Sequence, residues 1–194
     1  MMESLCVFCG SASGSRPAYA EVAGQLGQLM AQRKIKLIYG GGKVGMMGAL
    51  ADAVLAAGGQ VIGVIPGALV ERELAHHGCT DLIVVDSMHQ RKARMSDLAD
   101  GFLALPGGYG TLEELFEVIT WAQLGFHHKP CGLLNIEGFF DPLLAMLDQA
   151  ADQQFMSADC RSLLLTSSDP AAALDQLIAA HPHEQPRWID RSET

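Results

Sequence analysis

The sequence predicts an α/β protein in which a parallel β-sheet lies between two layers of helices. Short strand-like runs alternate with longer helical patterns along most of the chain. The strand-like runs are apolar at successive positions, which is typical of a parallel sheet that helices cover on both faces. The composition agrees, because hydrophobic residues make up 49% of the 194 residues, aromatic residues only 6%, and 21 glycines allow many tight turns.

The expected strands are short, and a helix or a loop separates each from the next. We predict about seven, at Leu5–Cys9, Lys36–Tyr39, Val61–Ile65, Leu82–Val85, Gly101–Leu105, Cys131–Leu134 and Leu163–Thr166. The helices are expected at Pro17–Arg33, Gly45–Ala57, Met88–Ala99, Thr111–Leu124, Asp141–Gln153 and Pro170–Ala180. Right-handed crossovers would make this a doubly wound, Rossmann-like sheet. One such domain is expected over residues 1–180, followed by a polar C-terminal tail over 181–194.

The charge and the cysteine content exclude several classes of protein. The formal net charge of −9 argues against a broad basic surface for nucleic acid. No apolar run approaches the ~20 residues of a membrane-spanning helix. The five cysteines form no regular framework, and Cys6 and Cys9 lie three apart on a strand, where they point to opposite faces. We therefore expect a reduced, cytoplasmic protein without nucleic-acid or membrane partners.

Two histidine pairs, His76–His77 and His127–His128, have only a superficial likeness to metal ligands. Adjacent residues rarely point at one ion, and no zinc-like spacing accompanies them. We expect surface or loop histidines, with His127 and His128 near the rim of a ligand crevice, and no metal site.

Glycine-rich or polar turns follow the first five predicted strands. Ligands of open parallel sheets bind outside the carboxyl ends of the strands, where such turns meet. The turns cover residues 10–14, 40–48, 66–67, 86–92 and 106–114. We therefore expect one crevice that brings Arg91 and Glu114 close together.

The most informative turn is Pro106–Glu114, which follows a predicted strand and opens a predicted helix. Three glycines in five positions let the backbone approach a ligand closely. The N-terminus of the helix adds partial positive charge, so the loop is suited to hold a phosphate. Glu114 lies about one turn inside the helix, and its side chain leans back toward this N-terminus. A phosphate site with a carboxylate beside it indicates chemistry on a phosphorylated substrate.

A basic cluster, Arg91, Lys92 and Arg94, begins another predicted helix. Positive side chains are unfavourable at a helix N-terminus unless an anion binds there. Arg91 and Arg94 share a helix face, so both can point at a phosphate or at Glu114. The alternative is a solvated basic face without a function.

The second turn matches the G-x-G-x-x-G pattern of dinucleotide-binding proteins through Gly40, Gly42 and Gly45. An NAD site also needs an acidic residue about 20 positions further on, where this chain has Ile65-Pro66. A Walker-type loop fails as well, because Lys43 is followed by valine rather than by serine or threonine. The glycines therefore favour close backbone contact with a nucleotide-sized ligand.

With these motifs the sequence resembles the Lonely Guy (LOG) family, the cytokinin riboside 5′-monophosphate phosphoribohydrolases. The resemblance covers nearly the whole chain, and its most specific part is Arg91-Lys92 together with P-G-G-x-G-T-x-x-E at 106–114. It also includes Cys9-Gly10-Ser11, Gly40–Gly48, Val64–Pro66, Met88–Lys92, Trp121–Gly125 and Lys129-Pro130. Ala12 departs from the family, which often has a second serine at this position.

The resemblance implies that Arg91 and Glu114 form the catalytic pair and that the phosphate loop consists of Gly107, Gly108, Gly110 and Thr111. It implies that Arg91 also contacts the substrate, together with Ser11, Gly41, Gly42, Gly45, Met88, Lys92, Tyr109 and Glu113. A homodimer is implied too, with sites near the subunit interface. No cofactor and no metal are implied.

The implied reaction is hydrolysis of the N-glycosidic bond of a purine nucleoside 5′-monophosphate, AMP or an N6-modified, cytokinin-type analogue, to the free base and ribose 5-phosphate. Glu114, kept ionised by the helix N-terminus and by Arg91, is expected to stabilise the ribosyl cation. One alternative is a module that senses AMP without cleaving it. Another is the lysine decarboxylase label that similar sequences carry, for which only Lys129 has a suggestive setting. The choice of base is expected to depend on the pocket volume near Met46, Met47 and Met88.

Overall fold

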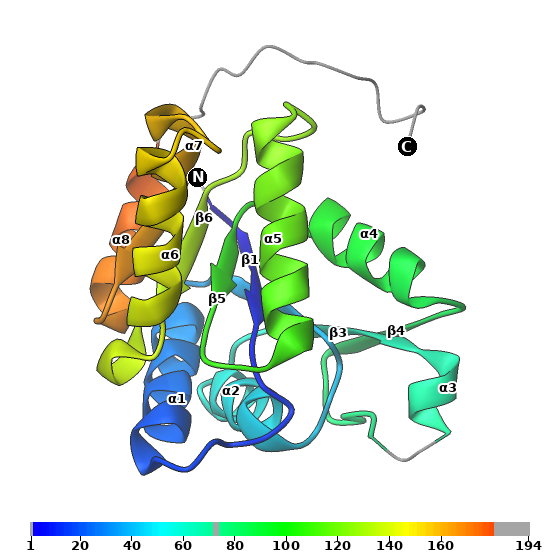
Figure 1. Cartoon of the computed structure of the whole chain (residues 1–194). Helices are drawn as coiled ribbons and strands as arrows, with labels where there is room; N and C mark the ends of the chain where they lie inside the picture. Colours follow the sequence, from blue (N-terminus) through cyan, green and yellow to red (C-terminus); the bar gives the residue numbers. More distant parts are fainter. Residues whose placement is uncertain (1, 72–73, 181–194) are drawn as a thin grey trace.

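The computed structural model describes residues 2–71 and 74–180, in which helices cover both faces of a parallel sheet (Figure 1). The seven strands are hydrogen-bonded in the order β4-β3-β2-β1-β5-β6-β7, and every pairing is parallel. Their bounds are β1 Ser4–Phe8, β2 Lys36–Tyr39, β3 Val61–Pro66, β4 Asp81–Val85, β5 Phe102–Ala104, β6 Cys131–Leu134 and β7 Leu164–Ser167. The predicted fold class and all seven predicted strands are confirmed.

The six predicted helices are also confirmed, as α1 Pro17–Gln32, α2 Gly45–Ala56, α4 Met88–Leu98, α5 Tyr109–Gln123, α6 Asp141–Asp152 and α8 Pro170–Ala179. Three short elements were not predicted: α3 Gly67–Val70, α7 Ala158–Ser162 and the 3-10 helix η1 Ile136–Gly138. Each has only three to five residues. Such a segment holds about one turn, so its sequence shows no helical periodicity.

The first strand, β1, lies in the middle of the sheet, and the order in which strands are added reverses beside it. It adds strands outward from β1 to β4 on one side, and from β5 to β7 on the other. β1 and β5 are therefore neighbours, and the turns that follow them are joined, because the Gly10 N–H donates to the Pro106 carbonyl at 3.0 Å. Ligands of doubly wound sheets bind at such a reversal point.

Two apolar layers hold the helices on the sheet. The first includes Leu26, Leu50 and Leu174, through which α1, α2 and α8 pack on one face. The second includes Met95 and Leu115, through which α4 and α5 pack on the opposite face, with α6 beside them (Figure 1). α4 and α5 therefore lie on the same side of the sheet, and their N-terminal turns follow the carboxyl ends of β4 and β5.

The predictions for the cysteines agree with this arrangement. Cys6 belongs to the α4 and α5 layer and Cys9 to the α1 and α2 layer, so their side chains point to opposite faces. All five cysteines are free. Over residues 2–71 and 74–180, no helix is long and apolar enough to cross a membrane, and no three His, Cys, Asp or Glu side chains are grouped to hold a metal. The predicted polar tail at 181–194 lies outside the described residues.

Candidate active site

A cavity of about 510 Å³ opens at the carboxyl ends of the central strands. Four of the five predicted turns contribute to it, together with the ends of β1 and β3. The lining residues are Val7, Phe8, Cys9, Gly10, Ser11, Gly40, Gly42, Val44, Met47, Ile65, Leu69, Leu74, Arg91, Gly108, Tyr109, Gly110, Thr111 and Glu114. Eight of the predicted site residues are among them: Ser11, Gly42, Arg91, Gly108, Tyr109, Gly110, Thr111 and Glu114.

The phosphate loop forms the wall of this cavity that lies next to β1. α5 begins at Tyr109, two residues before the predicted start, and its N-cap residue, Gly108, provides no side-chain cap. The first N–H groups of a helix have no carbonyl partner within the helix, so those of the first turn are available to a ligand. A Cβ atom at Gly107 would lie 2.1 Å from Thr111 Oγ1 and 2.9 Å from the Gly10 amide nitrogen. Only glycine lets the loop pack this closely, and such a glycine loop at a helix N-terminus is typical of anion sites.

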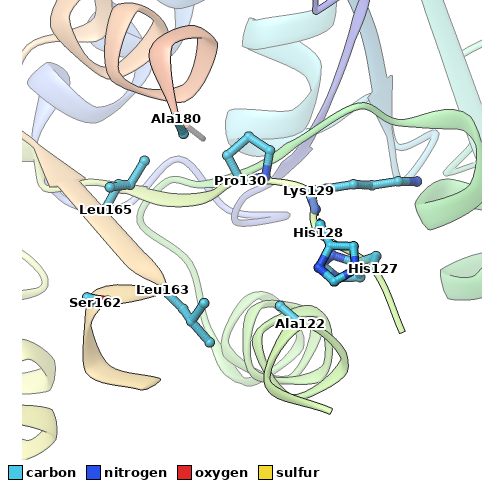
Figure 2. Close-up of a pocket in the computed structure, with 9 residues that line it drawn as sticks. All are labelled: Ala122, His127, His128, Lys129, Pro130, Ser162, Leu163, Leu165 and Ala180. Carbon is cyan, nitrogen blue, oxygen red and sulfur yellow. The ribbon is translucent and has the colours of Figure 1, made fainter. Parts of the chain in front are cut away.

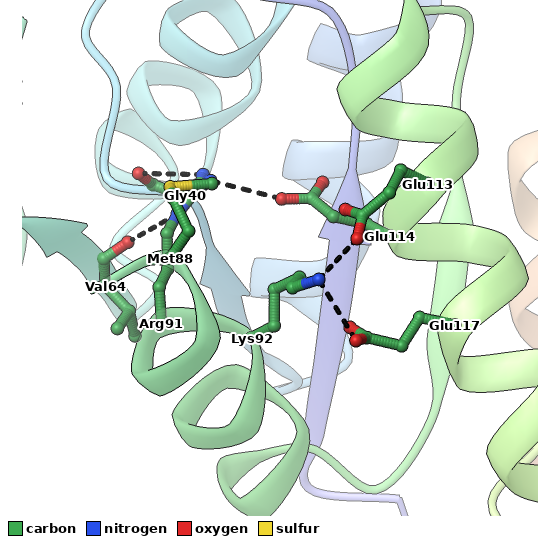
Figure 3. A network of polar contacts seen from close by, with 8 residues as sticks. All are labelled: Gly40, Val64, Met88, Arg91, Lys92, Glu113, Glu114 and Glu117. Atoms are coloured by element: carbon green, nitrogen blue, oxygen red, sulfur yellow. Dashed lines mark hydrogen bonds and ion pairs between the residues drawn. The ribbon is translucent and has the colours of Figure 1, made fainter.

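Arg91 and Glu114 meet at the floor of the cavity. Arg91 Nη1 lies 3.2 Å from Glu114 Oε1, and each side chain is about 10% exposed (Figure 3). The pair joins the first turn of α4 to the second turn of α5. The start of α4 is fixed by Ser87, whose hydroxyl accepts a hydrogen bond from the Gln90 N–H at 3.2 Å. The predicted meeting of Arg91 and Glu114 in one crevice thus agrees with the geometry.

Two backbone carbonyls hold the guanidinium of Arg91 in place. Its Nε donates to the Val64 carbonyl at 3.1 Å, and Nη2 donates to the Gly40 carbonyl at 3.3 Å. A Cβ atom at Gly40 would lie only 1.8 Å from Nη2. The absence of a side chain at Gly40 therefore leaves the space that the guanidinium fills. Because Nε and Nη2 are bonded to these carbonyls, Nη1 is the nitrogen that faces Glu114.

Burial raises the pKa of Glu114 above the ordinary value of a glutamate. The positive charges of Arg91 and Lys92 lower this pKa, and the negative charges of Glu113 and Glu117 raise it, but burial is the largest effect. Arg91 thus acts on the carboxyl group in the expected direction, but burial outweighs it. A raised pKa is common for a carboxyl group in a functional cavity.

The remaining predicted site residues lie outside the cavity lining. Gly41 and Gly45 have positive φ angles of 74° and 64°, and a Cβ at Gly45 would lie 2.3 Å from the Ser11 carbonyl, so Gly45 supports the Ser11 turn. Gly107 supports Thr111, and Met88 Sδ lies 3.9 Å from Arg91 Nη1. Gly45, Gly107 and Met88 thus contact residues that line the cavity without lining it themselves.

Three charged residues considered for the site do not line the cavity: Lys92, Glu113 and Arg94. Lys92 forms ion pairs with Glu113 and with Glu117 of α5, on the side of the Arg91–Glu114 pair away from Gly40 (Figure 3). Arg94 is exposed, so its expected approach to Glu114 is wrong. One helical turn after Arg91 the inward position of α4 is taken by Met95, which is 1% exposed, and Arg94 is rotated from it by about 100° toward solvent.

The cavity has an apolar wall, of which only Met47 was expected from the sequence. Val44, Met47, Leu69 and Leu74 lie on it, and two of them belong to α3 and the segment after it. The wall is fixed to the glycine turn, because the Lys43 N–H donates to the Leu74 carbonyl at 3.0 Å and the His76 N–H donates to the Gly41 carbonyl at 2.8 Å. Of the three methionines considered for base selection, only Met47 lines the cavity, and Met46 is buried in the core.

A second cavity, of about 280 Å³, lies at the opposite end of the sheet, where β6 and β7 begin (Figure 2). It is lined by His127, His128 and Lys129, among others. The expectation that the two histidines lie near the rim of the ligand crevice is therefore wrong, and His127 is buried, with Nε2 2.9 Å from the Val118 carbonyl. Lys129 Nζ donates to the Ser96 carbonyl at 2.7 Å. The lysine considered for decarboxylase chemistry thus does not line the cavity that contains Glu114.

Comparisons with known proteins show the family to which this chain belongs. A family model described as "Possible lysine decarboxylase" matches residues 47–177. The chain is 49% identical over 178 residues to cytokinin riboside 5′-monophosphate phosphoribohydrolase LOG7 of Arabidopsis thaliana. The alignment covers 92% of this chain and 82% of that relative. It is 50% identical over 163 residues to cytokinin riboside 5′-monophosphate phosphoribohydrolase LOG of Oryza sativa subsp. japonica, covering 84% of this chain and 67% of the relative. The chain belongs to the LOG family.

Solved structures place this LOG-family chain within a wider group that shares its fold. A molybdenum cofactor binding protein from Rippkaea orientalis superposes with a TM-score of 0.70 at 22% identity, over 92% of this chain and 97% of that one. The molybdenum cofactor carrier protein of Chlamydomonas reinhardtii also gives a TM-score of 0.70 at 22% identity, over 93% and 100%. At this identity the likeness concerns the fold alone.

Proposed function

We propose that this LOG-family protein hydrolyses the N-glycosidic bond of purine nucleoside 5′-monophosphates, AMP or its N6-modified, cytokinin-type analogues, to the free base and ribose 5-phosphate. The observation that carries the proposal is the Arg91–Glu114 pair, 3.2 Å apart, in the same cavity as the phosphate loop. Relatives at 49% and 50% identity bear the name of this activity.

Three parts of the cavity correspond to the three parts of such a substrate. The loop around Gly108 and Thr111 would bind the 5′-phosphate through the N–H groups of the α5 N-terminus. The apolar wall with Met47 and Leu74 would receive the flat base. The ribose would then lie between them, with its anomeric carbon above Glu114.

The chemistry assigned to Glu114 is stabilisation of positive charge. Cleavage of the bond between the anomeric carbon and the purine nitrogen leaves an oxocarbenium-like ribosyl cation. A carboxylate beside the anomeric carbon stabilises this cation and orients the attacking water, whose hydroxyl joins the sugar while a proton goes to the base. Arg91 holds the carboxylate in position, and the phosphate contacts fix the ribose so that binding energy is used at the scissile bond.

Incubation with AMP or isopentenyl-AMP, followed by chromatography for the free base, tests the proposal. Glu114→Gln keeps the shape and removes the charge, so turnover should fall by about a thousandfold while the nucleotide still binds. Arg91→Ala should also reduce turnover. Glu21→Gln, an exposed glutamate on α1, is the matched control and should retain full activity.

The rival function is a module that senses AMP without cleaving it. It predicts tight nucleotide binding by calorimetry with no release of base from the wild-type protein. The buried ion pair in the cavity favours the hydrolase, because a sensor would gain nothing from a carboxyl group of raised pKa at this position.

The assembly and the compartment are further parts of this proposal. Phe116 of α5 is 37% exposed, whereas Leu112, Ile119 and Trp121 pack on the core. We assign a homodimer that covers Phe116, and light scattering at micromolar concentration should give twice the chain mass; a monomer would refute it. Five free cysteines favour a reducing, cytoplasmic compartment.

A further inference from the structure

A second ion-pair network lies directly beside the Arg91–Glu114 pair. Lys92 Nζ contacts a carboxylate oxygen of Glu113 and lies 3.0 Å from Glu117 Oε1 (Figure 3). The Lys92 side chain is only 10% exposed, whereas Glu113 and Glu117 are 53% and 24% exposed. The ammonium is therefore enclosed between the two helices, with the two carboxylates toward solvent.

The two networks connect the same two helices through adjacent residues. Arg91 and Lys92 are neighbours on α4, and Glu113 and Glu114 are neighbours on α5. Adjacent helical residues differ by about 100° in direction, so each helix presents one charge to the cavity and one to its neighbouring helix. Glu113 and Glu117 are one turn apart on α5, so their carboxylates repel each other. The ammonium of Lys92 contacts both and offsets this repulsion.

We propose that Lys92 is a positioning residue, whose ion pairs with Glu113 and Glu117 hold α4 against α5 so that Arg91 meets Glu114. The inference rests on the function proposed above. It replaces the substrate contacts expected for Lys92 and Glu113.

The surroundings of Lys92 argue against a phosphate contact. Its ammonium already has two carboxylate partners, which give the network a net negative charge. Neither Lys92 nor Glu113 lines the cavity. An incoming phosphate would have to displace a carboxylate and would meet the negative charge of both glutamates.

The charges of Lys92 and Glu117 act on the pKa of Glu114, so this pKa reports on the network. The charged groups that act on Glu114 are Arg91 and Lys92 from α4 and Glu113 and Glu117 from α5. The thiols of Cys6 in β1 and of Cys9 just after it also face the carboxyl group, whose negative charge raises their pKa. Lys92 lowers the pKa of Glu114, and Glu117 raises it. Removing Lys92 should therefore move the acidic limb of the activity profile to higher pH, and removing the charge of Glu117 should move it to lower pH.

Steady-state kinetics on Lys92→Met tests the positioning role, with Lys34→Met, at an exposed lysine in the loop between α1 and β2, as the matched control. We expect kcat for AMP to fall about tenfold or more with KM changed less than about twofold, and Lys92→Arg to restore most of the turnover. A rise in KM with unchanged kcat would show a substrate contact and overturn the inference. Unchanged kcat and KM would overturn it as well.

A titration of the Glu114 carboxyl by 13C NMR on ligand-free protein gives a readout that needs no turnover. If Lys92 holds Arg91 in place, the pKa rises seen in Lys92→Met and Arg91→Met will be smaller in combination than their sum. Additive shifts mean that Lys92 acts only through its own charge, and the inference is then wrong. Should Lys92→Met fail to fold, Glu117→Gln decides, because an unmoved acidic limb contradicts the coupling. Wild-type protein that releases no base from AMP or isopentenyl-AMP disproves the proposed function, while the NMR result still stands.

Discussion

Replacing Gly40 with alanine should disable the site while leaving the fold intact. The added Cβ would lie 1.8 Å from Arg91 Nη2, and the guanidinium would have to withdraw by roughly 1.5 Å to reach van der Waals contact. That displacement breaks the 3.3 Å bond to the Gly40 carbonyl and opens the 3.2 Å pair with Glu114. A misplacement of about 1 Å in a catalytic site costs on the order of a hundredfold in rate, so kcat/KM should fall by about that factor.

The same variant should still fold. The clash falls on the end of a flexible side chain, and Gly40 is not among the glycines with positive φ, so alanine adds no backbone strain there. Loss of a hydrogen bond from a charged group costs about 1.5–3 kcal/mol in the free energy of unfolding, and the opened pair with Glu114 adds to this cost. Gly24→Ala is the control, because a Cβ there meets no atom within 4 Å, and alanine in the helix α1 should stabilise by about 0.5–1 kcal/mol. A folded Gly40→Ala protein with wild-type kcat/KM would refute the role given to the guanidinium.

Three further outcomes are expected. Adenosine should be on the order of a hundredfold poorer than AMP in kcat/KM, because it lacks the phosphate for which we propose the α5 N-terminus as the binding site; equal turnover of the two would contradict this. The proposed chemistry needs the ionised carboxylate, and burial raises the pKa of Glu114, so kcat/KM should fall on acidification at a pH above the ~4.3 of an ordinary glutamate. An acidic limb at or below ~4.3 would count against Glu114. Asp169→Ala removes the side chain that caps α8 by accepting the Ala172 N–H at 2.7 Å, so urea denaturation should show a loss of about 1 kcal/mol in the free energy of unfolding, without change in kcat.

The fold was predictable because its signals are local. Each strand is an apolar run of a few residues, and each long helix carries its own periodicity, so β1 and α5 could be located without knowledge of their neighbours. The rule that ligands bind at the carboxyl ends of parallel strands then brought Arg91 and Glu114 together. The glycines around 107 were informative for the same reason, since a close backbone approach restricts the residue type at that position.

The parts that escaped prediction depend on contacts between distant segments. α3 is too short for a periodic signal, so the apolar wall with Leu69 was missed. The partners of Lys92 depend on the rotation of α4 relative to α5, which no single helix encodes. The sign of the pKa change at Glu114 follows from its burial, and burial is a property of the assembled site.

The central position of β1 has a consequence for how the protein gains activity. Its residues pair with β2 on one side and with β5, about a hundred positions later in the chain, on the other. The bond between Gly10 and Pro106 joins the turns after β1 and β5, so we expect the phosphate loop to take its shape only once this long-range pairing has formed. Release of base during refolding should therefore report the pairing of β1 with β5, whereas helical circular dichroism should recover earlier from α1 and α2.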